Sequence, residues 1–154
     1  MKNTMRCLGI VALAAVIGFS VIACDTGMGS VDSALNGTWA NNEGYRINFN
    51  NGSFTMYDGS VQRGRGTYTT GGNILTLTIT GIYFGAQDAA SMGLPSTSRW
   101  YTRAELRTAM LNAWGSGMAS QIDSMLNSAF TTVSGPYSVS GNTLNWDGSR
   151  LTRQ

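Results

Sequence analysis

The sequence predicts a mainly β fold: an eight-stranded antiparallel up-and-down barrel with a two-helix insertion between strands 5 and 6. Two observations lead to this fold class. From Leu35 onward, short runs of alternating apolar and polar residues are separated by turn residues every eight to twelve positions or less, a spacing typical of barrels and sandwiches. Glycine also makes up twenty of the 154 residues, about twice the usual ~7%, which indicates many turns.

The turn residues define the strands. Two-residue turns are expected at 51–52, 72–73, 141–142 and 148–149, because Asn-Gly, Gly-Asn and Gly-Ser pairs favour tight hairpins. The candidate strands are residues 35–40, 44–49, 53–57, 61–70, 74–84, 131–140, 143–147 and 150–153. Directly paired residues on antiparallel strands share a face, so the four turns define one inner face. The expected pairs are Phe49 with Phe54, Ile47 with Met56, Tyr68 with Leu77, Thr70 with Leu75, Val139 with Leu144, Tyr137 with Trp146, Trp146 with Leu151 and Leu144 with Arg153.

The charges of two arginines decide between two possible turns near Asp58. A two-residue Asp58-Gly59 turn would point Arg63 and Arg65 into the core, where unpaired charge is costly. A three-residue loop over 58–60 leaves both arginines in solvent, and we expect this loop. It turns inward the alternate residues of the next strand, Gln62, Gly64, Gly66 and Tyr68. Inward glycines suit a strand that bends to close a barrel.

Residues from about 86 to 130 break the alternation and predict two helices. Thr102 and Glu105 have the spacing of a capping box, and Gly115 ends the helix that they start. A second helix covers about 117–129. The candidate lid residues repeat at helical spacing and are Leu106, Met110, Trp114, Met118, Ile122 and Met125. Since alternate loops of such a barrel lie at the same end, the insertion is expected at the mouth opposite the turns 51–52, 72–73 and 141–142. It either braces or plugs the barrel, covers a ligand cavity as a mobile lid, or inserts into lipid.

The N-terminus has the pattern of an export signal. Lys2 and Arg6 precede an uncharged run of sixteen residues, 8–23, which is short for a membrane-spanning helix of about 20 residues but suits a secretory signal. The run ends in Val-Ile-Ala-Cys at 21–24, which resembles the lipobox of bacterial lipoproteins. In that family a peptidase cuts before the cysteine, which then carries acyl chains.

This resemblance implies a domain organisation and a location. Residues 1–23 are the signal peptide, 24–34 a lipidated tether and 35–154 the barrel domain. Acyl chains on Cys24 imply a lipid-anchored protein of the bacterial cell envelope, in either the outer or the inner membrane. Several acyl chains hold a protein to a membrane where one does not.

The composition excludes several function classes. There is no histidine, which removes Ser-His-Asp and Cys-His catalysis and every histidine-ligated metal site. Cys7 leaves with the signal peptide and Cys24 becomes the anchor, so the mature domain has no free thiol. Once Lys2 and Arg6 are removed, eight basic residues face eight acidic ones. We therefore expect no enzyme, catalytic residue, metal site, cofactor or nucleic-acid partner; the oligomeric state is left open.

The first predicted strand carries a short family motif. Gly37, Thr38 and Trp39 resemble the G-x-W motif of lipocalins, and together with the lipobox they resemble small bacterial lipoproteins with a lipocalin-like domain. This resemblance implies that an arginine near the end of the last strand packs on the tryptophan and helps to close the barrel. Arg153 is the first candidate and Arg150 the second. The chain differs from lipocalins in its shorter strands, its lack of a disulfide and its helical insertion.

Two non-catalytic functions follow. In one, a lipid or other small hydrophobic ligand lies inside the barrel under the helical lid. In the other, the same side chains form a filled core, and the protein acts as a structural or protein-interaction lipoprotein; eight strands enclose just enough space for side chains or one small ligand. The inward residues of this cavity or core are Tyr45, Ile47, Phe54, Met56, Tyr68, Leu77, Tyr137 and Trp146.

Overall fold

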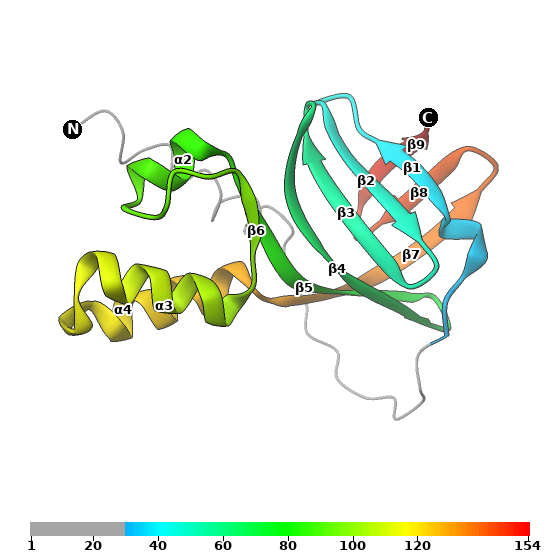
Figure 1. Cartoon of the computed structure of the whole chain (residues 1–154). Helices are drawn as coiled ribbons and strands as arrows, with labels where there is room; N and C mark the ends of the chain where they lie inside the picture. Colours follow the sequence, from blue (N-terminus) through cyan, green and yellow to red (C-terminus); the bar gives the residue numbers. More distant parts are fainter. Residues whose placement is uncertain (1–29) are drawn as a thin grey trace. The chain divides into compact units, whose positions relative to one another are not determined.

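The computed structural model describes residues 30–154. The predicted signal peptide, the lipobox and Cys24 lie outside the described residues. The chain divides into two compact units, a barrel unit of residues 30–80 and 132–154 and a helical unit of residues 81–131 (Figure 1). No helix in the part of the chain that the structure describes is both long and apolar enough to cross a membrane.

The barrel unit confirms the predicted fold class, an eight-stranded antiparallel up-and-down barrel. Its strands are β1 (Gly37–Ala40), β2 (Tyr45–Asn50), β3 (Ser53–Asp58), β4 (Val61–Gly71), β5 (Ile74–Phe84), β7 (Thr132–Ser140), β8 (Thr143–Trp146) and β9 (Ser149–Arg153). Each of these strands pairs with the next along the chain, and β1 pairs with β9 to close the barrel. All eight were expected from the sequence, with ends that differ by at most two residues.

The predicted register holds for β2–β3 and β7–β8 and fails for β8–β9. Phe49 lies opposite Phe54 and Tyr137 opposite Trp146, as expected. The expected 148–149 turn is wrong: the turn residues are Asp147 and Gly148, both at positive φ, as a tight hairpin turn requires. Leu144 therefore lies opposite Leu151, and the pairings of Trp146 with Leu151 and of Leu144 with Arg153 are wrong. The register shifts by two residues, so every side chain keeps its predicted face.

The loop between β3 and β4 also differs from its prediction. The expected three-residue loop is wrong: Asp58 pairs directly with Val61, which leaves a two-residue turn. A β-bulge between Met56 and Tyr57 then shifts the register. The bulge turns Gly64 and Gly66 inward and leaves Arg65 exposed, as predicted, whereas Gln62, expected inward, lies opposite Tyr57 and is half-buried, as is Arg63. A bulge, not a longer loop, keeps the charge out of the core.

Gly66 marks a close approach of β4 and β5. A Cβ atom at this position would lie 1.9 Å from the carbonyl oxygen of Thr78 and 2.9 Å from the ring of Phe54. No side chain fits in that space. The backbones of β4 and β5 therefore approach each other here because residue 66 is glycine.

Residues 30–36 form a strap that the sequence did not predict. Thr70 donates to the carbonyl oxygen of Ser30 through its backbone amide, at 2.6 Å, and through its hydroxyl, at 2.9 Å. Ser33–Leu35 form a 3₁₀ turn capped by Asp32, and Leu35 is fully buried. The predicted tether over 24–34 is therefore too long: residues 30–34 belong to the barrel, because their backbone and side chains bond to it.

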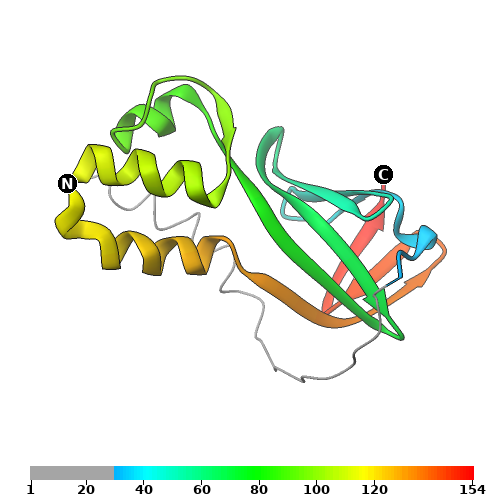
Figure 2. The same ribbon diagram turned by 60° about the horizontal axis from the view of Figure 1, so that its bottom comes forward.

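The helical unit contains two paired helices and three short elements, one of which is the 3₁₀ turn η2 (Ser116–Met118) between the helices. The capping box of Thr102 and Glu105 starts α3 (Arg103–Trp114), as predicted. The antiparallel partner α4 (Ala119–Ala129) lies beside it (Figures 1 and 2) and is joined to it by Arg107, which donates two hydrogen bonds to Asp123 at 2.6 and 3.0 Å. The sequence did not predict α2 (Ala86–Ser91) or β6 (Arg99–Tyr101), which pairs with the end of β5.

Candidate functional site

Large side chains line the barrel interior. Of the eight predicted interior residues, five are buried and three are half-buried. The buried ones are Ile47, Phe54, Tyr68, Leu77 and Trp146, and the half-buried ones are Tyr45, Met56 and Tyr137. Further buried side chains of the same unit, which the prediction left out of the interior set, are Trp39, Phe49, Leu75, Val133, Leu144 and Leu151.

The aromatic rings among these residues pack directly on one another. The ring of Phe49 meets that of Tyr68 edge to face, with centroids 4.9 Å apart, and lies 6.5 Å from the ring of Phe54. Edge-to-face pairs at such distances are attractive beyond the apolar area that they bury. Phe49 was expected on the inner face from the 51–52 turn, and its contacts give it the central place among these three rings.

One polar atom inside the barrel unit has no protein partner. The indole Nε1 of Trp146 is buried and makes no hydrogen bond. An unpaired buried donor costs free energy, so native structures usually give such a group a protein, water or ligand partner. Among the described residues of the barrel unit, Trp146 is therefore the interior side chain whose N–H donor could still bind an acceptor.

Polar contacts join the strap to the barrel strands. The Tyr137 hydroxyl donates to Asp32 at 2.9 Å, and the Tyr68 hydroxyl donates to the side chain of Asn36 at 3.2 Å. Burial raises the pKa of both tyrosines; for Tyr137 the hydrogen bond to Asp32 raises the pKa further. Both phenols are therefore neutral donors at physiological pH, as these bonds require. The Asp-Ser-Ala sequence at 32–34, a helix N-cap pattern, was the signal in the sequence for this structure.

Gly37, Trp39 and Arg153 lie together where β1 meets β9. Trp39 is fully buried and sits directly opposite Arg153 in the β1–β9 pairing. The Arg153 guanidinium lies over the indole ring, 4.4 Å from its centre, and the Trp39 Nε1 donates to Leu35. Gly37 takes a φ of 123°, which side chains rarely allow. Arg150, the second candidate, is exposed.

The predicted lid residues divide into two groups. Leu106, Met110 and Ile122 are buried, with exposed fractions of 2% or less, as is Leu126 on the same face of α4. Met118 is half-buried, while Trp114 and Met125 are each 36% exposed. Helical spacing alone grouped all six, but Trp114 lies at the last turn of α3, where its indole donates to the carbonyl of Met92.

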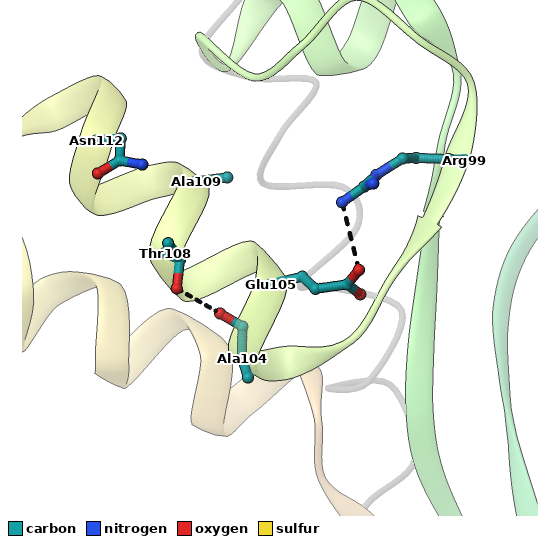
Figure 3. Close-up of a pocket in the computed structure, with 6 residues that line it drawn as sticks. All are labelled: Arg99, Ala104, Glu105, Thr108, Ala109 and Asn112. Atoms are coloured by element: carbon teal, nitrogen blue, oxygen red, sulfur yellow. Dashed lines mark hydrogen bonds and ion pairs between the residues drawn. The ribbon is translucent and has the colours of Figure 1, made fainter.

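A shallow, open pocket lies between β6 and α3. Its volume is about 440 Å³, and it is lined by Arg99, Ala104, Glu105, Thr108, Ala109 and Asn112 (Figure 3). Arg99 and Glu105 face each other across it at 3.5 Å, each with about half of its side chain exposed. Glu105 also accepts hydrogen bonds from the backbone and hydroxyl of Thr102, at 2.8 Å each. These bonds hold the carboxylate as a helix cap and a charged surface group.

In the described residues, no group of three or more His, Cys, Asp or Glu side chains is placed to hold a metal ion. No protein-family model, curated protein or solved structure matches the chain. The structure thus defines a class by its fold, a lipocalin-like up-and-down β-barrel with a helical unit inserted between β5 and β7.

Proposed function

We propose that the chain is a lipid-anchored protein of the bacterial cell envelope that acts without catalysis, through contacts with a partner protein. In this proposal the barrel is a packed scaffold. The observation that supports it is the burial of large side chains in the barrel, where Trp39, Phe49, Tyr68, Leu75 and Leu144 are all at most 1% exposed. Side chains packed at native density leave few voids larger than a water molecule.

The pocket of the helical unit is the proposed contact site. It offers an exposed arginine, an exposed glutamate and the polar side chains of Thr108 and Asn112 on one face of α3. A shallow, mixed-charge surface of this kind suits the polar rim of a protein contact. It is too open to enclose a small ligand, which needs a concave site that buries most of the ligand's surface.

A photo-crosslinking amino acid tests the contact site. Asn112, exposed at the pocket, is replaced by the crosslinker in the lipidated protein in whole cells, and the exposed Thr67 on β4 is the matched control. The proposal expects one discrete crosslinked product from position 112, lost when Arg99→Glu reverses the pocket's charge. Equal crosslinked products from both positions, or a product from position 112 that persists in the Arg99→Glu variant, contradict the proposed contact site.

The unpartnered indole of Trp146 favours a second candidate function, the binding of a small hydrophobic ligand in the barrel. An acceptor group on the ligand would satisfy the Nε1 donor. Native mass spectrometry of residues 25–154, followed by titration with a fluorescent fatty acid, separates the two functions. The packed-scaffold proposal expects the mass of the chain alone and no saturable uptake. A stoichiometric bound lipid, weakened by Trp146→Phe, would replace it with the ligand-binding function.

The anchor is tested separately. We expect Cys24→Ala to abolish incorporation of a labelled fatty acid and to release the protein from the membrane fraction. Cys7→Ala is the matched control, because residue 7 falls within the proposed signal peptide. A label that persists in Cys24→Ala contradicts the lipobox.

A further inference from the structure

The chain enters the barrel at a defined end. The strap, residues 30–36, bonds to β4 through Ser30 and Thr70, and to the 51–52 turn through Asn36, whose side chain is hydrogen-bonded to Asn51 twice at 2.9 Å. The turns 51–52, 72–73 and 141–142 connect successive strand pairs of the meander at this same end. We call the strap together with these three turns the strap end.

The strap end carries almost no charge. Among the residues of the described barrel unit, its only acidic or basic side chains are Asp32 and Arg153. Both are bonded to the protein, Asp32 to Tyr137 and Arg153 to the carbonyl oxygens of Ala34 and Asn36. The other acidic and basic side chains of the unit lie at or near the opposite turns or along β4, and they are Glu43, Arg46, Asp58, Arg63, Arg65, Asp147 and Arg150.

Exposed apolar side chains are found at the strap end. Val31 in the strap is 44% exposed, and Ile74, which follows the 72–73 turn, is 39% exposed. The residues of the three turns at this end are asparagine and glycine. An uncharged surface with exposed aliphatic groups is cheaper to bring against a membrane than a charged one, because no ion loses its water.

The position of the proposed anchor, Cys24, indicates that the membrane is what this surface contacts. Five residues separate Cys24 from Ser30, and a chain of this length spans at most about 20 Å when fully extended. Ser30 is fixed to β4. An acyl group on Cys24 would therefore keep the strap end within that distance of the lipid.

We propose that the strap end rests on the membrane surface, with Val31 and Ile74 against the lipid and the opposite turns at 41–44, 59–60 and 147–148 directed away. This orientation rests on the proposed lipidation of Cys24. It makes the strap a second membrane contact beside the acyl chains, and stable anchoring often combines two such signals.

Lipid-borne quenching tests the orientation. The lipidated protein is reconstituted in phosphatidylcholine vesicles that contain a spin-labelled lipid, with an environment-sensitive fluorophore on one introduced cysteine. Asn73→Cys places the probe at the strap end, and Glu43→Cys places it at an opposite turn; both positions are exposed. We expect several-fold stronger quenching at position 73 than at position 43. In the Asn73→Cys background, Val31→Asp with Ile74→Asp should weaken the quenching, and Val61→Asp should not.

The outcomes separate this orientation from the anchor itself. The chain has two cysteines, Cys7 and Cys24, so a cleaved and acylated protein takes up one fluorophore only. One fluorophore with equal quenching at positions 73 and 43, or with stronger quenching at 43, overturns the orientation and leaves the anchor standing. A second fluorophore on Cys24, or failure to float with the vesicles, removes the anchor and overturns both proposals.

Discussion

The guanidinium of Arg153 lies 4.4 Å above the centre of the Trp39 ring and donates to the carbonyl oxygens of Asn36 and Ala34, at 2.9 and 2.7 Å. One side chain thus joins the last strand, the first strand and the strap. The planar group both stacks on the ring and forms a two-pronged hydrogen-bond donor. The closing pair of strands is held by this side chain as well as by its backbone ladder.

Arg153→Lys should destabilise the barrel although it keeps the charge. A lysine ammonium cannot stack on the ring and reach both carbonyls at once, so we expect a loss of about 1–3 kcal/mol in the free energy of unfolding. Urea unfolding of residues 25–154, followed by tryptophan fluorescence, measures it. Arg150→Lys on the exposed side of the same strand is the control and should change stability by less than about 0.5 kcal/mol. Equal effects of the two substitutions contradict the role of Arg153.

Trp39→Ala should be among the most damaging single substitutions in the barrel. The side chain is fully buried under Arg153, and its removal leaves a large cavity, at a cost of about 3–5 kcal/mol. Thermal unfolding by circular dichroism gives the size of the effect. Val61→Ala, at a position that is 41% exposed, should be close to neutral. A stable Trp39→Ala barrel would show that the G-x-W segment is not part of the core.

A methyl group at Gly66 should prevent normal closure of the barrel. An added Cβ would lie 1.9 Å from the Thr78 carbonyl oxygen, so β4 and β5 must separate, and we expect a loss of several kcal/mol or failure to fold. Gly71→Ala on the same strand is the matched control, since no atom lies within 4 Å of its added Cβ. That variant should be neutral or slightly more stable. Soluble yield and urea midpoint report both effects.

Alkaline pH should weaken the attachment of the strap. Burial, followed by the bond to Asp32, raises the pKa of Tyr137 above its ordinary value of 10.0. The unfolded chain therefore loses this proton at a lower pH than the folded protein does. The stability that depends on the neutral phenol is complete below pH 10 and falls as the pH rises through the higher folded value. The urea midpoint, followed from pH 8 to pH 11, should decline in this window.

Tyr137→Phe isolates that contribution. At neutral pH it should cost about 1 kcal/mol through the lost bond to Asp32, and its alkaline decline should be shallower than that of the parent, with Tyr68 responsible for the remainder. Val61→Ala, at an exposed position on β4, is the control and should reproduce the parent curve. If the urea midpoint of Tyr137→Phe falls with pH in parallel with that of the parent, the contribution assigned to the Tyr137 phenol is contradicted.

The hairpins of the barrel could be predicted because their determinants are local. The Asn51-Gly52 turn and the alternation on either side of it place Phe49 opposite Phe54, as found. The capping box at Thr102 likewise starts α3 through contacts between residues three positions apart. The predictions are wrong where two alternative turns leave the same side chains on the inner face of the barrel. A turn at 147–148 and one at 148–149 both turn Leu144 inward, and the chain uses the first, with Asp147 and Gly148 both at positive φ.

The sequence by itself determined which side of each barrel strand is apolar, how many strands the barrel has and where the helical insertion begins, since these follow from residue periods of 2 and 3.6 and from turn chemistry. Only the tertiary structure decided that residues 30–36 form a strap and that Arg153 completes it. Arg153 and Ala34 are 119 positions apart, and Tyr137 and Asp32 are 105 apart. The strap is short and polar, so its order comes from bonds to distant strands that exist only once the barrel has closed.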